Sequence, residues 1–167
     1  MRVAAISCVL LLGCGVTDGN ESRTFRDDPM AILASKADFV PERMTGYWHE
    51  VARFPDGLCG GGLVRFGMDE TGRLLIEETC GGARQTARVE RVGPGRLRMT
   101  QGDLARDLWV LWTDTNYRTA ILVAPDGSGG RVLNRDPALP GDRREAVLEI
   151  LDFNGFNTSL LTFSPAG

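Results

Sequence analysis

The stretch Gly46-Tyr47-Trp48-His49-Glu50-Val51-Ala52-Arg53-Phe54-Pro55 decides the fold, because it opens a long series of strand-like segments. Its side chains alternate between two faces, and Trp48, Glu50 and Phe54 share one of them. A period of two is typical of a half-buried strand. The turn signal Pro55-Asp56-Gly57 ends the segment.

Seven further segments of this kind follow, and Gly, Pro, Asp or Asn turn signals separate them. A helix is predicted next, with Asp142 as its cap, Glu145 completing a capping box and Asn154-Gly155 ending it. A last strand is predicted over Thr158–Phe163. The pattern favours an all-β barrel or sandwich followed by one helix. The seven segments are Leu63–Asp69, Arg73–Thr79, Arg84–Val92, Arg96–Thr100, Asp107–Thr113, Tyr117–Ala124 and Arg131–Arg135.

The run Leu108-Trp109-Val110-Leu111-Trp112 is apolar on both faces, which is typical of a strand buried on both sides. The predicted helix has an apolar stripe formed by Val147, Leu148, Ile150 and Leu151. We therefore expect this helix to pack against the outer face of that strand.

Three motifs occur in order: Gly46 to Pro55, then Thr113 to Ala120 with Asp114 and Tyr117, and then Val132 to Pro137 with Arg135. Together they resemble the motifs of the lipocalins. The resemblance covers about residues 38 to 165 and is strongest to bacterial outer-membrane lipoprotein lipocalins of the apolipoprotein D-like branch. The chain departs from that branch at His49, where Tyr is usual, and at Arg131-Val132, which replace an aromatic pair.

This resemblance implies an eight-stranded antiparallel up-and-down barrel with one C-terminal α-helix and a final short strand. It also implies that Trp48 plugs the closed end of the barrel, with the guanidinium of Arg135 across its ring. Gly46, Asp114 and Tyr117 support the same end, so this fold-lock motif is structural and not catalytic.

Binding is then expected in the open cup, because a barrel of this size can hold one small ligand. A barrel filled by its own side chains is the alternative. The sequence also does not decide which face of the strand over residues 107–113 points inward. The opposite orientation would place Trp109 and Leu111 inside the barrel. The candidate lining residues are Glu50, Phe54, Val64, Phe66, Leu108, Val110 and Trp112.

The first 13 residues read as an export signal, with Arg2 ahead of a short apolar run. Leu11-Leu12-Gly13-Cys14 resembles a bacterial lipobox, which implies cleavage before Cys14 and lipidation of its thiol. A plain secretory signal is the alternative. We therefore expect a lipid-anchored flexible tether over residues 14–37 and one domain over residues 38–167, facing the periplasm at the outer membrane.

Cys59 and Cys80 are predicted to form a disulfide, because an exported protein lies in an oxidising compartment. Folding the chain about the turn at Asp69-Glu70-Thr71-Gly72 places residue 59 near residue 82. Two free thiols are the alternative.

Composition argues against several other functions. The net charge of −3 and the scattered Arg residues argue against nucleic-acid binding. The single histidine, His49, cannot build a His-rich metal site, and no serine-nucleophile elbow is present. We expect no cofactor, no metal and no catalysis, but binding and storage or transport of a small lipophilic ligand of the fatty acid or lysophospholipid class. There are two alternatives: an enzyme of this fold that acts on an apolar substrate, and an envelope protein with a filled barrel. The sequence does not determine the oligomeric state.

Overall fold

The computed structural model describes residues 24–55 and 62–165. After the 3₁₀ helix η1 (Pro41–Met44), the strands follow one another almost without interruption, and each of the first eight predicted strands is present with its ends shifted by up to three residues. The last predicted strand, Thr158–Phe163, keeps only Thr162 and Phe163, because Thr158–Leu160 form a 3₁₀ helix. The elements are β1 (Gly46–Arg53), β2 (Gly62–Met68), β3 (Leu74–Cys80), β4 (Ala83–Gly93), β5 (Arg96–Gln101), β6 (Leu104–Thr113), β7 (Thr119–Val123), β8 (Gly130–Asn134), α1 (Gly141–Phe153), the 3₁₀ helix η2 (Thr158–Leu160) and β9 (Thr162–Phe163).

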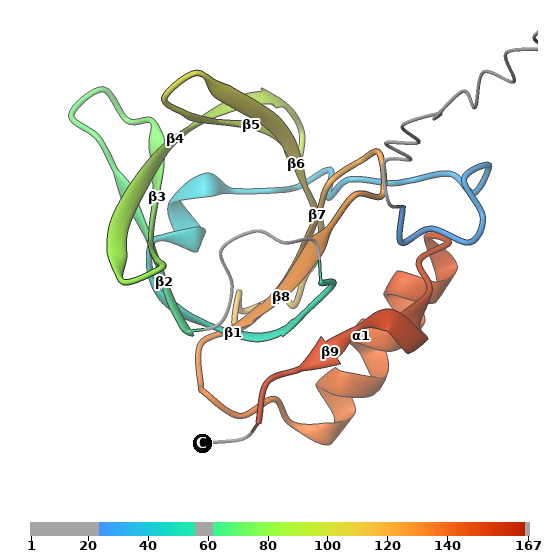
Figure 1. The fold of residues 1–167 in the computed structure, drawn as a ribbon. Coiled ribbons are helices and arrows are strands. Elements are labelled where there is room, and N and C mark those ends of the chain that lie inside the picture. Colours follow the sequence, from blue (N-terminus) through green and yellow to red (C-terminus); the bar gives the residue numbers. More distant parts are fainter. Residues whose placement is uncertain (1–23, 56–61, 166–167) are drawn as a thin grey trace, which may run out of the picture.

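The strands β1 to β8 form a closed antiparallel barrel (Figure 1). Each of them pairs with its neighbours in the chain, and β1 closes the ring by pairing with both β2 and β8. The short strand β9 adds to β1 from outside, through Ala52 and Arg53. The predicted eight-stranded barrel with one C-terminal helix and a final short strand is confirmed for the described residues.

The hairpin between β2 and β3 shows how the local sequence sets the register. The carboxylate of Asp69 accepts hydrogen bonds from the backbone N–H groups of Thr71 and Arg73, and Gly72 takes a positive φ of 79°. Arg65 lies opposite Glu77 across this hairpin. That pairing agrees to within one position with the register expected from the turn.

Two β-bulges interrupt the strict alternation of inward and outward side chains. One lies in β1 between Glu50 and Ala52, opposite β8, and the other lies in β6 between Val110 and Trp112, opposite β7. A bulge inserts one residue into a strand, so every side chain beyond it changes face.

Helix α1 lies against the outside of the barrel, beside β9 (Figure 1). It ends as predicted at Asn154, and Gly155 follows with a φ of 78°. The predicted cap at Asp142 is wrong, because the helix already begins at Gly141 after an extended Pro140. Asp142 therefore lies in the first turn, where its negative charge still suits the helix dipole.

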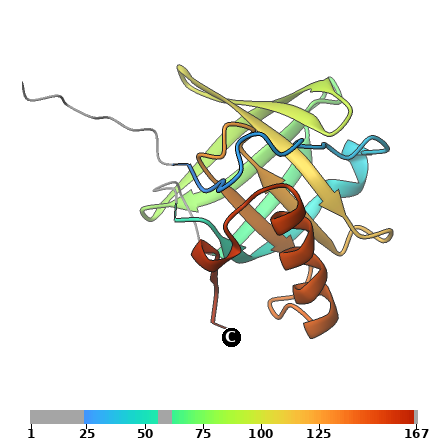
Figure 2. The same cartoon turned by 90° about the vertical axis from the view of Figure 1, so that its right-hand side faces the viewer.

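The segment before β1 packs on the barrel over more of its length than predicted. Phe25 is buried, its N–H donates to the carbonyl of Gly127 at 2.7 Å, and its ring stacks on Phe54. Figures 1 and 2 show residues 24–35 passing beside the C-terminal end of α1. The flexible tether predicted over residues 14–37 is therefore too long at its C-terminal end, because Phe25 already packs against the barrel.

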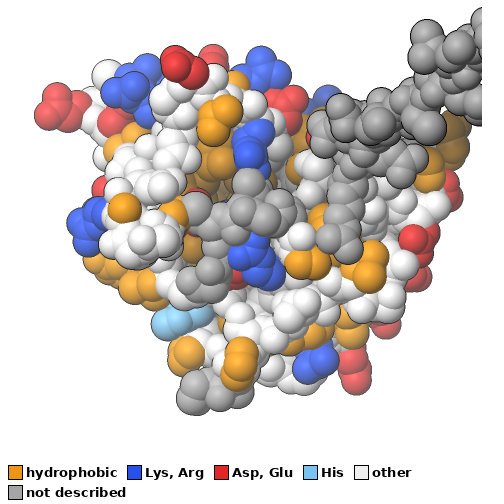
Figure 3. Space-filling model, in the orientation of Figure 1, with side chains coloured by type: hydrophobic (Ala, Val, Ile, Leu, Met, Phe, Trp, Pro, Cys, Tyr) orange, Lys and Arg blue, Asp and Glu red, His pale blue; other side chains and the backbone are white. Residues whose placement is uncertain are grey.

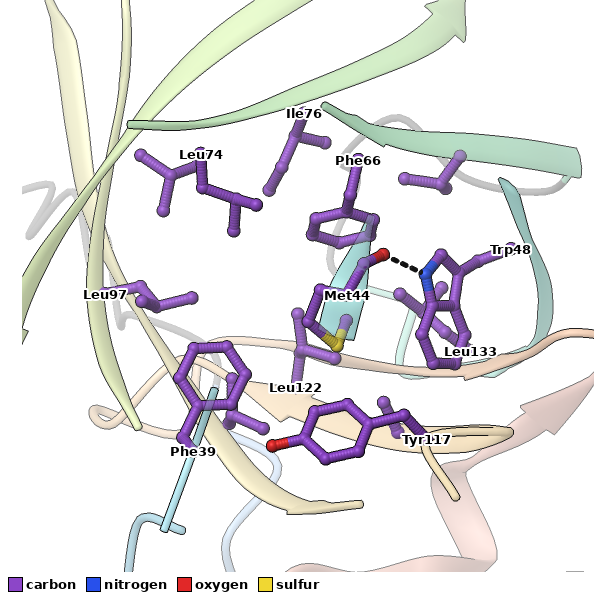
Figure 4. Close-up of a cluster of buried hydrophobic side chains, with 14 residues drawn as sticks. Phe39, Met44, Trp48, Phe66, Leu74, Ile76, Leu97, Tyr117, Leu122 and Leu133 are labelled. Atoms are coloured by element: carbon purple, nitrogen blue, oxygen red, sulfur yellow. Dashed lines mark hydrogen bonds between the residues drawn. The ribbon is translucent and has the colours of Figure 1, made fainter. Parts of the chain in front are cut away.

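Buried apolar side chains form two separate clusters. The interior cluster lies inside the barrel and includes Trp48, Phe66 and Leu122 (Figure 4). The outer cluster joins the barrel wall to α1 through Val147 and Leu151, which confirms the predicted packing of the helix.

Candidate functional site

At the closed end of the barrel, Trp48 is completely buried. Its indole N–H donates to the carbonyl of Met44 at 2.6 Å, and Figure 4 shows this bond among the interior side chains. The guanidinium carbon of Arg135 lies 3.8 Å from the centre of the Trp48 ring. The structure thus brings together the two residues that the first and third motifs contribute.

Arg135 also ties three backbone segments to this end. Its Nη1, Nη2 and Nε donate to the carbonyls of Tyr47, Arg43 and Tyr117 at 3.0, 3.0 and 3.3 Å. Partial burial of the guanidinium lowers the pKa of Arg135. The neighbouring Gly46 has a φ of 102°, and a Cβ there would lie 3.1 Å from the Nη1 of Arg135. The positive φ therefore favours glycine here, and a larger side chain would also crowd the guanidinium of Arg135.

Tyr117 and Asp114 shape the hairpin between β6 and β7, beside the same end. Tyr117 has a φ of 53°, and its hydroxyl accepts a hydrogen bond from the N–H of Val40 at 2.9 Å. The carboxylate of Asp114 accepts from the N–H groups of Arg118 and Thr119. Desolvation opposes ionisation of Asp114, but the backbone donors outweigh it and hold its pKa below the usual value.

The open end carries the candidate cup. Four of the predicted lining residues belong to the interior cluster or pack against it: Val64, Phe66, Leu108 and Val110. Trp109 and Leu111 belong to the outer cluster, so the alternative with an inverted strand does not hold.

Two predicted lining residues, Phe54 and Trp112, are placed in the outer cluster and not in the cup. Each lies beyond a β-bulge, in β1 and in β6 respectively, and the inserted residue turns the rest of the strand over. Phe54 instead stacks between Phe25 and Phe156, with ring centres 5.1 and 5.5 Å away. Strict alternation along the sequence cannot reveal such a change of face.

Glu50, the predicted polar contact, is buried and belongs to an ionic cluster. Its carboxylate oxygens lie 3.5 Å from Nε of Arg131 and 3.8 Å from Nη1 of Arg53. Arg131 also donates to the carboxylate of Glu78 at 2.7 Å. Sequence reasoning missed Arg131 and Glu78. The signal was present, because each lies two residues from an interior apolar residue, Leu133 and Ile76.

A cavity of about 40 Å³ lies between the apolar interior and two members of this ionic cluster, Glu78 and Arg131. Of the predicted lining residues, Phe66 and Leu108 line this cavity. That volume has room for a few water molecules and is below the roughly 300–1,000 Å³ of pockets for drug-sized ligands. On the face seen in Figure 3, hydrophobic side chains and Lys or Arg side chains lie close together near the centre. The walls of the cavity are apolar at Phe66, Ile76, Met99, Leu108 and Leu122 and charged at Glu78, Arg106, Asp107 and Arg131.

A more open hollow of about 360 Å³ lies at the closed end, between η1 and the strands β3 to β5. Phe39, Leu74 and Leu97 line it, but Arg73 and Glu90 border it as well. We place the candidate site at the open end because the smaller cavity reaches the barrel interior and is flanked by the half-buried ion pair of Glu78 and Arg131.

Other expected features fall partly outside the described residues. Cys80 is disulfide-bonded, but Cys59 lies outside the described part of the chain, so their pairing stays a prediction. The export signal and Cys14 also lie outside it. Within residues 24–55 and 62–165, no cluster of metal-ligating side chains occurs, and no helix has the length and apolarity that a membrane span requires.

The fold is shared with solved structures of low sequence identity. Insecticyanin from the tobacco hornworm Manduca sexta is similar with 19% identity and a TM-score of 0.62, over 81% of this chain and 85% of that one. Lobster apocrustacyanin A1 is similar with 14% identity and a TM-score of 0.62, over 75% and 79%.

Apocrustacyanin C2 is also similar, with 12% identity and a TM-score of 0.60, over 84% of this chain and 93% of that one. No curated protein matches the sequence significantly. The family model of the lipocalin-like domain matches residues 41–166, which span the whole barrel, the helix α1 and β9. The closed barrel, its Trp48–Arg135 contact and this match together show that the chain belongs to the lipocalin-like family.

Proposed function

We propose that this protein binds a small lipophilic molecule at the open end of its barrel and stores or carries it in the periplasm, held at the outer membrane by a lipidated Cys14. The observation that carries the proposal is the cavity with apolar walls beside the ionic cluster of Glu50, Arg131 and Glu78. An apolar wall and one charged end suit a ligand with an apolar chain and one polar group.

The proposed mechanism is passive burial. Apolar surface removed from water contributes roughly 25 cal/mol per Å², less the cost of ordering. The cavity of about 40 Å³ is smaller than such a chain, so side chains must move on binding. Met99 lines the cavity and is only partly buried, and methionine side chains repack easily. Met99 is therefore the residue we expect to make room.

The charged end favours one ligand class over another. Arg131 and Arg106 bring positive charge to the cavity, while Glu78 and Asp107 bring negative charge. A head group that carries both signs can pair with both, whereas a simple carboxylate meets two like charges. We therefore propose a lysophospholipid as the preferred ligand, ahead of a fatty acid.

Native mass spectrometry of the protein purified from bacterial membranes, followed by solvent extraction, tests this function. We expect a co-purified lipid, and we expect added lysophosphatidylethanolamine to bind more tightly than a fatty acid of equal chain length. The variant Leu108→Trp fills the cavity and should abolish uptake. Leu148→Trp changes a partly buried leucine of the outer cluster and is the matched control. Equal uptake by both variants would place the ligand elsewhere.

A second function is favoured by the small volume of the cavity. If its own side chains fill the barrel, the protein would have a structural role in the cell envelope and would bind a partner through its surface. Failure of the wild-type protein to take up either lipid, with a folded barrel by circular dichroism, would support that function instead.

A further inference from the structure

The large hydrophobic side chains with the highest exposure in the described residues gather around one end of α1. Met30, Ile32 and Phe153 are 87%, 85% and 82% exposed. We propose that these three side chains, here called the apolar patch, insert into the surface of the bilayer to which the protein is tethered. This inference rests on the proposed membrane anchor at Cys14, but not on ligand binding.

The patch is held in place by the fold. The N–H of Asp27 donates to the carbonyl of Gly155 at 2.9 Å, and the N–H of Ala34 donates to the side-chain oxygen of Asn154 at 3.3 Å. A Cβ on Gly155 would lie 2.6 Å from the carbonyl oxygen of Asp28, so the two segments approach as closely as glycine allows. Residues 27–34 are therefore fixed against the end of α1, which carries Phe153.

Arg26 strengthens this attachment from the other side. Its Nη2 donates to the carbonyl of Ala31 at 2.5 Å, and its Nε donates to the carbonyl of Asn154 at 3.3 Å. Ala31 lies between Met30 and Ile32, so the turn that presents these two side chains is tied to the residue that follows Phe153. The exposure of the patch is thus a property of a fixed structure and not of a frayed end.

The length of chain between the patch and the anchor limits its distance from the membrane. Phe25 is the buried residue nearest to the anchor in the described chain, and it lies eleven positions after Cys14. Eleven residues span at most roughly 40 Å when fully extended. A lipidated Cys14 therefore keeps the patch, which begins five residues after Phe25, near the bilayer and raises its effective concentration there.

The same attachment brings the open end of the barrel to the membrane side. Phe25 bonds to Gly127 in the turn between β7 and β8. The next residues of that turn, Ser128 and Gly129, line the cavity. Docking through the patch would therefore hold the mouth of the cup beside the lipid surface and shorten the path of a lipid into it.

The charges near the patch define the kind of surface it suits. Asp27 and Asp28 are exposed beside Met30, and Asp152 is exposed beside Phe153. These carboxylates disfavour an anionic surface, so the contact is driven by apolar burial. We expect it to form on zwitterionic lipid and to persist when salt is raised, because screening weakens only the charge terms.

Hydrogen–deuterium exchange on the full lipidated protein tests the proposal. The protein is purified from bacterial membranes, its acyl chains are confirmed by mass spectrometry, and it is reconstituted in vesicles of phosphatidylcholine and phosphatidylethanolamine. We expect exchange in residues 27–34 and 152–156 to be slower on vesicles than in detergent at the same protein concentration.

The triple variant Met30→Ser, Ile32→Ser, Phe153→Ser should lose this protection. The control variant Tyr47→Ser, Val92→Ser changes exposed apolar residues elsewhere and should keep it. Equal protection in both variants, or none in the wild type, overturns the proposal. So does protection that appears in detergent as the protein is concentrated, which would assign the patch to a second copy of the chain.

A protein recovered without acyl chains would overturn the proposal together with the membrane location. Lipid uptake by the cup is measured separately, so its failure can be distinguished from failure of the patch.

Discussion

The side chain of Arg135 covers the ring of Trp48 at 3.8 Å and at the same time donates to carbonyls from three separate segments of the chain. One guanidinium therefore joins the segment before β1, the start of β1 and the hairpin after β6. Such a fork of donors cannot be replaced by an ammonium group.

Replacing either partner should weaken the fold without changing ligand preference. Trp48→Ala should lower the free energy of unfolding by about 3–5 kcal/mol, as other large core truncations do. Arg135→Lys should lower it by about 1–3 kcal/mol, because hydrogen bonds to carbonyls are lost. Urea denaturation measures both values. Loss of lipid uptake at unchanged stability would show that this end takes part in binding.

Phe54 should matter for stability and not for binding, because it packs in the outer cluster against Phe25 and Phe156. Phe54→Ala should cost about 3–5 kcal/mol of unfolding free energy and leave lipid uptake by the surviving folded protein unchanged. Thermal unfolding and native mass spectrometry provide the two readouts. Weaker lipid uptake by a stably folded variant would show that Phe54 takes part in ligand binding.

Asp114 should make stability depend on pH in the acid range. Its pKa in the folded protein lies below the usual value of 3.8, so the folded state favours the ionised carboxylate. The stabilisation is therefore complete above the unfolded-state pKa and is lost as pH falls through the folded-state pKa. Asp114→Asn should be less stable than the wild type by about 1–2 kcal/mol at neutral pH, and the gap should close below pH 3.8. A gap of constant size across that range would mean that the charge is not the cause.

The disulfide of Cys80 should pair with Cys59. Mass analysis of the protein without reductant should find neither thiol alkylated, and proteolysis should release one peptide pair that contains both residues. Alkylation of Cys59 in the unreduced protein would assign Cys80 another partner.

The order of strands could be predicted from the sequence because turn residues and a period of two are local signals. The hairpin at Asp69 and Gly72 is an example, since its side chain and backbone make the turn without help from the rest of the chain. The end of α1 at Gly155 is equally local.

The composition of the cup could be predicted only in part. Val64 and Phe66 follow the simple alternation of β2, whereas Phe54 and Trp112 are turned over by bulges that form only when β1 and β6 meet their partners. The ionic cluster of Glu50, Arg131 and Glu78 joins three strands that are far apart in the sequence. Such a contact depends on barrel closure, which no local pattern contains.

The bond between Phe25 and Gly127 also has a mechanical consequence. A pull on the chain from its N-terminal side reaches a buried residue of the described structure first at Phe25, and from there it passes to the turn between β7 and β8 and to Asn157. Tension applied from that side would thus strain the rim of the barrel before it reached Trp48 and Arg135 at the opposite end. Stretching single molecules from the N-terminus should release the rim at a lower force than the rest of the barrel, whereas a single rupture event would show that both ends yield together.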